Sequence, residues 1–142
     1  MKINSTSTTN YRLKVVTGLL ITPLLIALTA CSTAIDYAKL SKSSYEQNRF
    51  NEAIDNANLA IEKDPEYSYS WFWLGMSQLK TNQYQDAINS LSKAGQLNSD
   101  TDLQKSITYH IGYAYSQIDD CDNAITFYSQ AIISGSDWMA HL

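Results

Sequence analysis

The chain has few of the residues from which catalytic and metal sites are built. Its 142 residues include only two His and two Cys. His110 and His141 do not form a metal-ligand spacing such as H-E-x-x-H, and the sequence has neither a Gly-rich phosphate loop nor a G-x-S-x-G segment. We therefore expect no catalytic, metal or cofactor site, and we expect that the protein is not an enzyme.

Glycine and proline are also scarce, at five and two residues, and only 17% of residues are charged while 44% are hydrophobic. This composition favours a folded helical protein over a disordered one. The length leaves room for one domain, so we expect a single module.

Acidic residues are missing from the N-terminal part of the chain. Every Asp and Glu lies after Cys31, whereas Lys2, Arg12 and Lys14 lie within the first fourteen residues. The whole chain carries −4 and these three residues contribute +3, so the remainder carries −7. An acidic remainder argues against binding to nucleic acid and against adhesion to anionic lipid head groups.

The uncharged segment at 15–30 reads VVTGLLITPLLIALTA and follows the basic stretch directly. This layout is typical of a secretory signal. The alternative is a transmembrane helix, but the segment contains Pro23 and several Thr and is shorter than the roughly 20 residues needed to span a bilayer. The sequence therefore predicts a signal peptide over residues 1–30.

The last four residues of this region, Leu28-Thr29-Ala30-Cys31, resemble the lipobox of bacterial lipoproteins. The resemblance implies that the signal is cleaved and that Cys31 carries fatty acids such as palmitate, with 31–33 as a lipidated tether. The alternative is an ordinary signal with an incidental Cys. Ser32 stands where the family's inner-membrane retention signal has Asp, which favours the outer membrane, with the protein facing the periplasm.

Three segments of the remaining chain resemble one another. RFNEAIDNANLAI, QYQDAINSLSKAG and DCDNAITFYSQAI align on Ala53, Ala87 and Ala124, which are 34 and then 37 residues apart. Each segment has apolar residues at helical spacing, as in Ala53, Ala57 and Ala60, which predicts a helix with one buried face. A fixed period of this length indicates a repeat protein.

The repeats resemble the tetratricopeptide repeat (TPR) family, whose first helix follows the pattern W-x2-L-G-x2-Y. The matching residues are Tyr37, Leu40, Ser41 and Ser44 in the first repeat, Trp71, Leu74, Gly75 and Gln78 in the second, and Thr108, Ile111, Gly112 and Tyr115 in the third. The resemblance implies an all-α fold of three helix-turn-helix repeats, at about 34–67, 68–101 and 105–138, stacked as a short right-handed superhelix. An unrelated helical bundle is the alternative, but it would not explain the period.

Several packing details are expected from this alignment. Small residues such as Gly75 and Gly112 should let paired helices approach closely, with Leu40 and Leu74 filling the space between helices. The turns should lie at 47–51, 81–85 and 118–122, and the three extra residues should fall in a loop at 98–104.

Two features of the third turn have competing interpretations. Cys121 takes the place of Phe50 and Tyr84, so we expect a buried side chain rather than a reactive thiol. The acidic cluster Asp119, Asp120 and Asp122 lacks the Gly and distal Glu of a calcium loop, so we expect it to cap the following helix.

In the TPR family, the first helices line a concave groove that binds proteins. The family's groove positions predict these partner-binding residues: Tyr69, Phe72, Met76, Leu79, Tyr109 and Tyr113. About half of this stripe should be ordinary core packing. The Lys and Asn residues of the family's chaperone-binding members are missing, so we expect a different partner.

The resemblances together imply an adaptor or scaffold that binds another envelope protein in envelope, pilus or cell-wall assembly. The alternative is a structural lipoprotein that self-associates as a homo-oligomer through an end interface at Tyr128, Ile132 and Trp138. The stub at 139–142 is too short to cap the third repeat. Either the chain is part of a longer protein, or this end is an interface.

Overall fold

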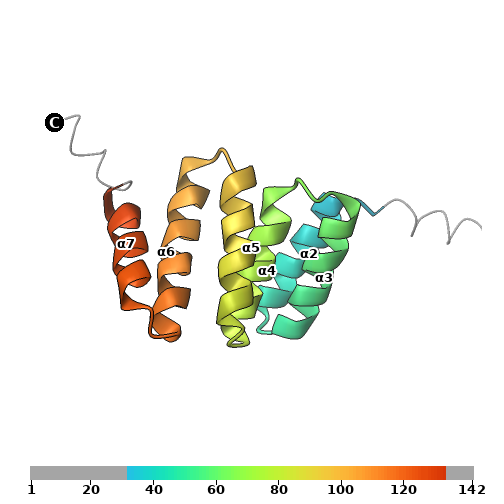
Figure 1. Cartoon of the computed structure of the whole chain (residues 1–142). Helices are drawn as coiled ribbons and strands as arrows, with labels where there is room; N and C mark the ends of the chain where they lie inside the picture. The colour runs from blue at the N-terminus through green and yellow to red at the C-terminus, as the bar shows by residue number, and fades with distance from the viewer. Residues whose placement is uncertain (1–31, 134–142) are drawn as a thin grey trace, which may run out of the picture. The chain divides into compact units, whose positions relative to one another are not determined.

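The computed structural model describes residues 32–133, which form six α-helices (Figure 1). The predicted signal peptide, Cys31, Trp138 and the stub at 139–142 lie outside the described residues. Within the described part, no helix is long and apolar enough to cross a membrane.

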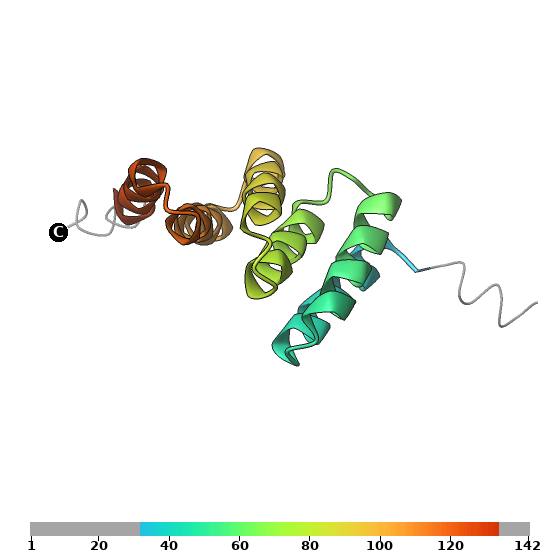
Figure 2. The ribbon, with the colours of Figure 1, turned by 60° about the horizontal axis from the view of Figure 1, so that its bottom comes forward.

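The six helices form three consecutive hairpins. Their bounds are α2 (Ala34–Glu46) and α3 (Phe50–Lys63), α4 (Ser68–Lys80) and α5 (Tyr84–Leu97), and α6 (Thr101–Gln117) and α7 (Cys121–Ile133). Within a hairpin the two helices pack together, and the second helix of each hairpin packs against the first helix of the next (Figures 1 and 2). The predicted all-α repeat fold is confirmed.

The turn inside each hairpin depends on one residue in the left-handed conformation. Asn48, Asn82 and Asp119 have φ angles of 60°, 61° and 60°, and they recur at the spacing of the repeats. Asn and Asp tolerate this conformation better than other residues with a side chain. The turns are shorter than expected, because Phe50 and Tyr84 already begin helices.

Each turn also closes with the same hydrogen bond. The backbone N–H of the residue after the left-handed position donates to the carbonyl oxygen five residues back. The donor and acceptor pairs are Arg49 to Ser44 at 2.9 Å, Gln83 to Gln78 at 2.9 Å, and Asp120 to Tyr115 at 3.0 Å. These bonds satisfy carbonyl groups that a helix end would otherwise leave without a partner.

Small residues bring the two helices of a hairpin into close contact, as predicted. A Cβ atom at Gly75 would lie 2.6 Å from Cγ of Leu91, and a Cβ atom at Gly112 would lie 3.1 Å from Cδ1 of Tyr128. Both distances are shorter than ordinary van der Waals contact. The partner helices contribute buried alanines at the repeat positions, including Ala53 and Ala87.

The alignment was wrong about Leu40. Its equivalents Leu74 and Ile111 are buried, at 6% and 4% exposure, whereas Leu40 is 52% exposed. Leu74 lies on α4 and Ile111 on α6, and each of these helices packs against the second helix of the preceding hairpin. Within the described residues, α2 has no preceding hairpin to cover it.

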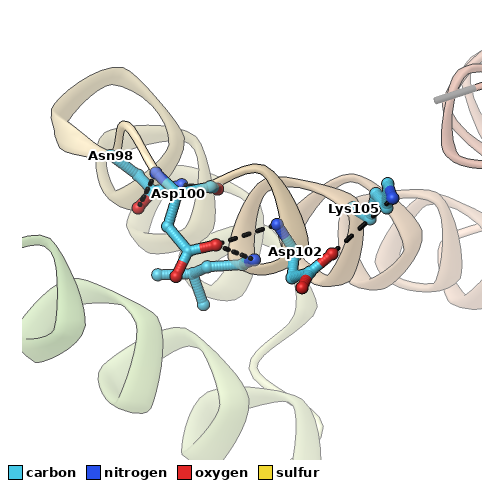
Figure 3. A network of polar contacts seen from close by, with 5 residues as sticks. Asn98, Asp100, Asp102 and Lys105 are labelled. Atoms are coloured by element: carbon cyan, nitrogen blue, oxygen red, sulfur yellow. Dashed lines mark hydrogen bonds and ion pairs between the residues drawn. The ribbon is translucent and has the colours of Figure 1, made fainter. Parts of the chain in front are cut away.

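The three extra residues of the third repeat lengthen a helix, so the predicted loop at 98–104 is confirmed only for 98–100 and was wrong for 101–104. Helix α6 has 17 residues, against 13 in α2 and in α4. Figure 3 shows how it begins: the Asp100 carboxylate accepts hydrogen bonds from the N–H groups of Asp102 at 2.9 Å and Leu103 at 3.2 Å. This cap starts the helix at Thr101 and leaves only three residues between α5 and α6.

Candidate functional site

The first helices of the three hairpins line one pocket of about 300 Å³. Its residues are Tyr45 from α2, Met76, Leu79 and Lys80 from α4, and Tyr109, His110 and Tyr113 from α6. Helix α2 makes more contact with α4 than α6 does. The wider gap between α4 and α6 is therefore where the groove is open.

The predicted groove residues separate into two groups. Tyr109 and Tyr113 line the pocket and are exposed, at 52% and 37%. Met76 and Leu79 also line it, but they are buried and form its apolar floor.

The other two predicted residues do not line this pocket. Phe72 is 7% exposed and belongs to the hydrophobic core, so the structure corrects its placement on the groove surface. The ring of Phe72 packs at 5.1 Å from that of Trp73, between centroids. Tyr69 is exposed, and its ring lies 5.8 Å from that of Tyr67, away from the pocket lining.

Sequence reasoning missed Lys80 and His110 as site residues. Each directly follows a predicted groove residue, Leu79 or Tyr109. The alignment predicts groove residues at one set of positions on each helix. At the gap between α4 and α6, the residues that directly follow Leu79 and Tyr109 also line the pocket. The pocket lining also includes Tyr45, whose ring lies 5.5 Å from that of Trp73.

A second pocket, of about 430 Å³, lies beside the first. It is lined from α6 by Lys105, Ser106, Tyr109 and His110 and from α7 by Tyr128, Ala131 and Ile132. Tyr109 and His110 line both pockets, and the Tyr109 ring lies 5.4 Å from that of Tyr128. Two of the three predicted end-interface residues, Tyr128 and Ile132, therefore lie next to the groove.

The linings of both pockets contain Lys residues but no Asp or Glu. Lys105 forms an ion pair with Asp102 on its own helix, at 3.6 Å. Within residues 32–133, Lys80 forms no ion pair. The ammonium group of Lys80 is therefore a cation at the pocket that no carboxylate of the described domain neutralises.

The His110 ring is oriented by its own helix. Nδ1 lies 2.7 Å from the carbonyl oxygen of Ser106, which accepts but cannot donate, so we assign the ring hydrogen to Nδ1. Nε2 then remains for a ligand. Burial lowers the pKa of His110 below 6.5, the Ser106 hydrogen bond opposes this shift, and the nearby charge of Lys80 adds to it. Burial and the Lys80 charge therefore both favour the neutral imidazole.

The prediction that Cys121 is buried was wrong, because Cys121 is exposed at the start of α7. At the equivalent positions, the Phe50 ring reaches Tyr45, at 5.6 Å between centroids, and Tyr84 packs against the core. The short Cys side chain has no comparable reach.

One residue of the acidic cluster near Cys121, Asp120, caps α7, as predicted. The Asp120 carboxylate accepts a hydrogen bond from the N–H of Asn123 at 3.2 Å. Within residues 32–133, no three His, Cys, Asp or Glu side chains are grouped in a way that could hold a metal ion.

Comparisons with known proteins agree with this architecture. Residues 57–89 and 106–132 each match a tetratricopeptide repeat model. No curated protein matches the chain in sequence.

Several solved structures share the fold. The N-terminal domain of stress-induced protein-1 (STI-1) from C. elegans is 19% identical, with a TM-score of 0.65 over 71% of this chain and 83% of that one. The second TPR of Spaghetti (RPAP3), bound to the HSP90 peptide SRMEEVD, is 16% identical, with a TM-score of 0.66 over 75% and 96%. MamA AMB-1 is 17% identical, with a TM-score of 0.68 over 76% and 62%.

The hairpin stack and its groove define a helical repeat protein of the kind that binds other proteins. The two repeat matches support membership of the tetratricopeptide repeat family, and the chain has an all-α TPR fold.

Proposed function

We propose that this protein is a lipid-anchored adaptor on the periplasmic face of the bacterial outer membrane. In this proposal, the groove holds a segment of another envelope protein during envelope, pilus or cell-wall assembly. The observation that carries the proposal is the pocket shared by α2, α4 and α6, with Tyr109 and Tyr113 exposed over an apolar floor. Exposed aromatic side chains over apolar pockets are typical binding anchors.

A TPR domain of the same fold holds a peptide, as the RPAP3 structure with its HSP90 peptide illustrates. The two chains are 16% identical, so the neighbour supports the mode of binding but does not identify a partner.

The anchor in this proposal depends on the lipobox-like sequence that ends at Cys31. Thr33 caps α2, so only residues 31–33 would connect the lipid to the first helix. At about 3.5 Å per residue, this tether holds the repeats close to the membrane. Replacing Cys31 with Ser removes the acylated thiol, so labelled palmitate should no longer be incorporated. Labelling that persists in Cys31→Ser would refute the anchor.

Site-specific cross-linking in cells tests the groove. A photoreactive amino acid is placed at Tyr113 in the pocket and, as the control, at Glu62, which is exposed on α3. The proposal expects a protein that is captured from Tyr113 and not from Glu62. Capture of the same proteins from both positions, or of nothing from Tyr113, would contradict it.

Self-association is the second candidate function, and the exposed face of α7 favours it. Ile125 and Ile132 are 65% and 72% exposed, which is unusual for large apolar side chains on a helix of a monomeric domain. Cross-linking that captures only further copies of the chain would support this candidate. A monodisperse monomer in light scattering at high protein concentration would exclude it.

A further inference from the structure

The groove lining lacks acidic side chains, although the domain as a whole is acidic. Residues 32–133 contain seven Lys or Arg and thirteen Asp or Glu, which gives a net charge of −6. Helix α4, which forms the floor of the first pocket, contains no acidic residue, and Lys80 is its only charged residue. The groove therefore differs in charge from the rest of the domain.

Lys80 shares the pocket lining with a second polar side chain, the imidazole of His110. The charge of Lys80 acts on His110 across the gap between α4 and α6. The Nδ1 atom of His110 is engaged by the Ser106 carbonyl, so Nε2 is the ring nitrogen left for a ligand. Lys80 and a protonated His110 would together supply two donors to one acceptor group.

The rest of the lining is apolar or aromatic. Met76 and Leu79 form the floor, and Tyr109 and Tyr113 line the α6 side. A basic partner residue in this pocket would face Lys80 with no carboxylate in the lining, and like charges at short distance repel each other. A ligand that matches both the Lys80 and His110 pair and the apolar remainder of the lining has an anionic group next to an apolar side chain.

We infer that the groove recognises a partner segment in which an Asp or Glu lies beside a large apolar or aromatic residue, with the carboxylate at Lys80 and His110. This inference rests on the proposed function and adds the chemistry of the partner. The apolar side chain packs over Met76 and Leu79.

This arrangement couples binding to protonation. The ionisable groups that line the two pockets beside His110 are Tyr45 on α2, Lys80 on α4, Lys105, Tyr109 and Tyr113 on α6, and Tyr128 on α7. None is a carboxylate, so a carboxylate brought by the partner is the anion that would stabilise protonated His110. Binding should therefore take up a proton and strengthen as the pH falls from about 7.5 to about 6.

The full-length lipoprotein in detergent is tested with random 12-residue peptides displayed on phage. Lys80→Glu reverses the charge at the pocket. Lys63→Glu is the matched control, because Lys63 occupies the last turn of α3 as Lys80 occupies that of α4 but does not line either pocket. Circular dichroism of each variant establishes that it is folded.

The wild type and Lys63→Glu should both enrich peptides with Asp or Glu next to Phe, Leu or Met, and Lys80→Glu should enrich Lys or Arg instead. The most enriched wild-type peptide, once synthesised, should bind Lys80→Glu on the order of tenfold more weakly. His110→Gln should remove the pH dependence of its affinity.

Three results would overturn the inference. The first is that the wild type enriches peptides without a preference for acidic residues. The second is that Lys80→Glu enriches peptides of the same charge as the wild type does. Either result would mean that the groove binds peptides through a different chemistry. The third is the absence of any enrichment on the wild type, which would also refute the proposed function. If Lys80→Glu does not fold, the salt dependence of wild-type binding decides, because an ionic contact at Lys80 must weaken as NaCl rises from about 0.05 M to about 0.5 M.

Discussion

The hydroxyl group of Ser41 donates a hydrogen bond to the carbonyl oxygen of Ala53, with 2.7 Å between the two oxygens. Ser41 is fully buried and occupies the repeat position held by Gly75 and Gly112 in the other hairpins. The first hairpin therefore accommodates a larger residue at its crossing point, because the added hydroxyl finds an acceptor on the opposite helix.

Replacing Ser41 with Ala should lower the free energy of unfolding by about 1 kcal/mol, since a buried hydrogen bond is lost while the cavity left is small. Urea denaturation measures this change. Ser99→Ala, at an exposed loop position, is the control and should leave the stability within about 0.5 kcal/mol. Equal stability of Ser41→Ala and wild type would mean that the hydrogen bond contributes nothing net.

Gly75→Ala should destabilise the domain by about 1–3 kcal/mol, because the new methyl group would collide with the buried Leu91 side chain. Gly95→Ala is a matched control in the last turn of α5. There the nearest atom to the new Cβ is Nε2 of Gln104, at 3.3 Å and at the end of a flexible side chain. Because Ala favours helix over Gly by about 1 kcal/mol, Gly95→Ala should be neutral or stabilising. Similar losses in both variants would argue against the close contact at Gly75.

The folded domain should lose stability below about pH 6.5 because of His110. Its pKa is lowered in the folded state, chiefly by burial, so the unfolded chain binds the proton more readily. The stabilising contribution of neutral His110 is thus present above the unfolded pKa of 6.5 and is lost as the pH falls through the lower folded value. Thermal unfolding across this range should show a smaller decline in His110→Gln than in the wild type. An identical decline in both proteins would rule out His110 as its source.

Substitutions in the groove and in the core should have separable effects. Tyr113→Ala should weaken partner binding by about 1–3 kcal/mol and leave the fold intact, because Tyr113 is exposed at the pocket. Phe72→Ala should instead lower the free energy of unfolding by about 3–5 kcal/mol, because Phe72 is in the core. Binding assays and chemical denaturation on both variants test this. A destabilised Tyr113→Ala protein that still binds its partner normally would reverse the assignment.

Features that recur locally in the chain could be predicted from the sequence alone. The repeat period, the small residues at Gly75 and Gly112 and the buried alanines at Ala53 and Ala87 were all predicted. These features depend on contacts inside one helical hairpin, and each hairpin contains the residues that make them.

Which copy of a repeated residue is buried was decided by the tertiary structure. Leu40 and Leu74 occupy the same place in the repeat, yet within residues 32–133 only Leu74 has a preceding hairpin to cover it. Likewise, Phe72 is enclosed by the core, while Lys80 and His110 line a pocket because α4 and α6 separate between them. Burial depends on neighbours that are distant in the chain, and a pattern read along one helix carries no information about how far apart two helices stand.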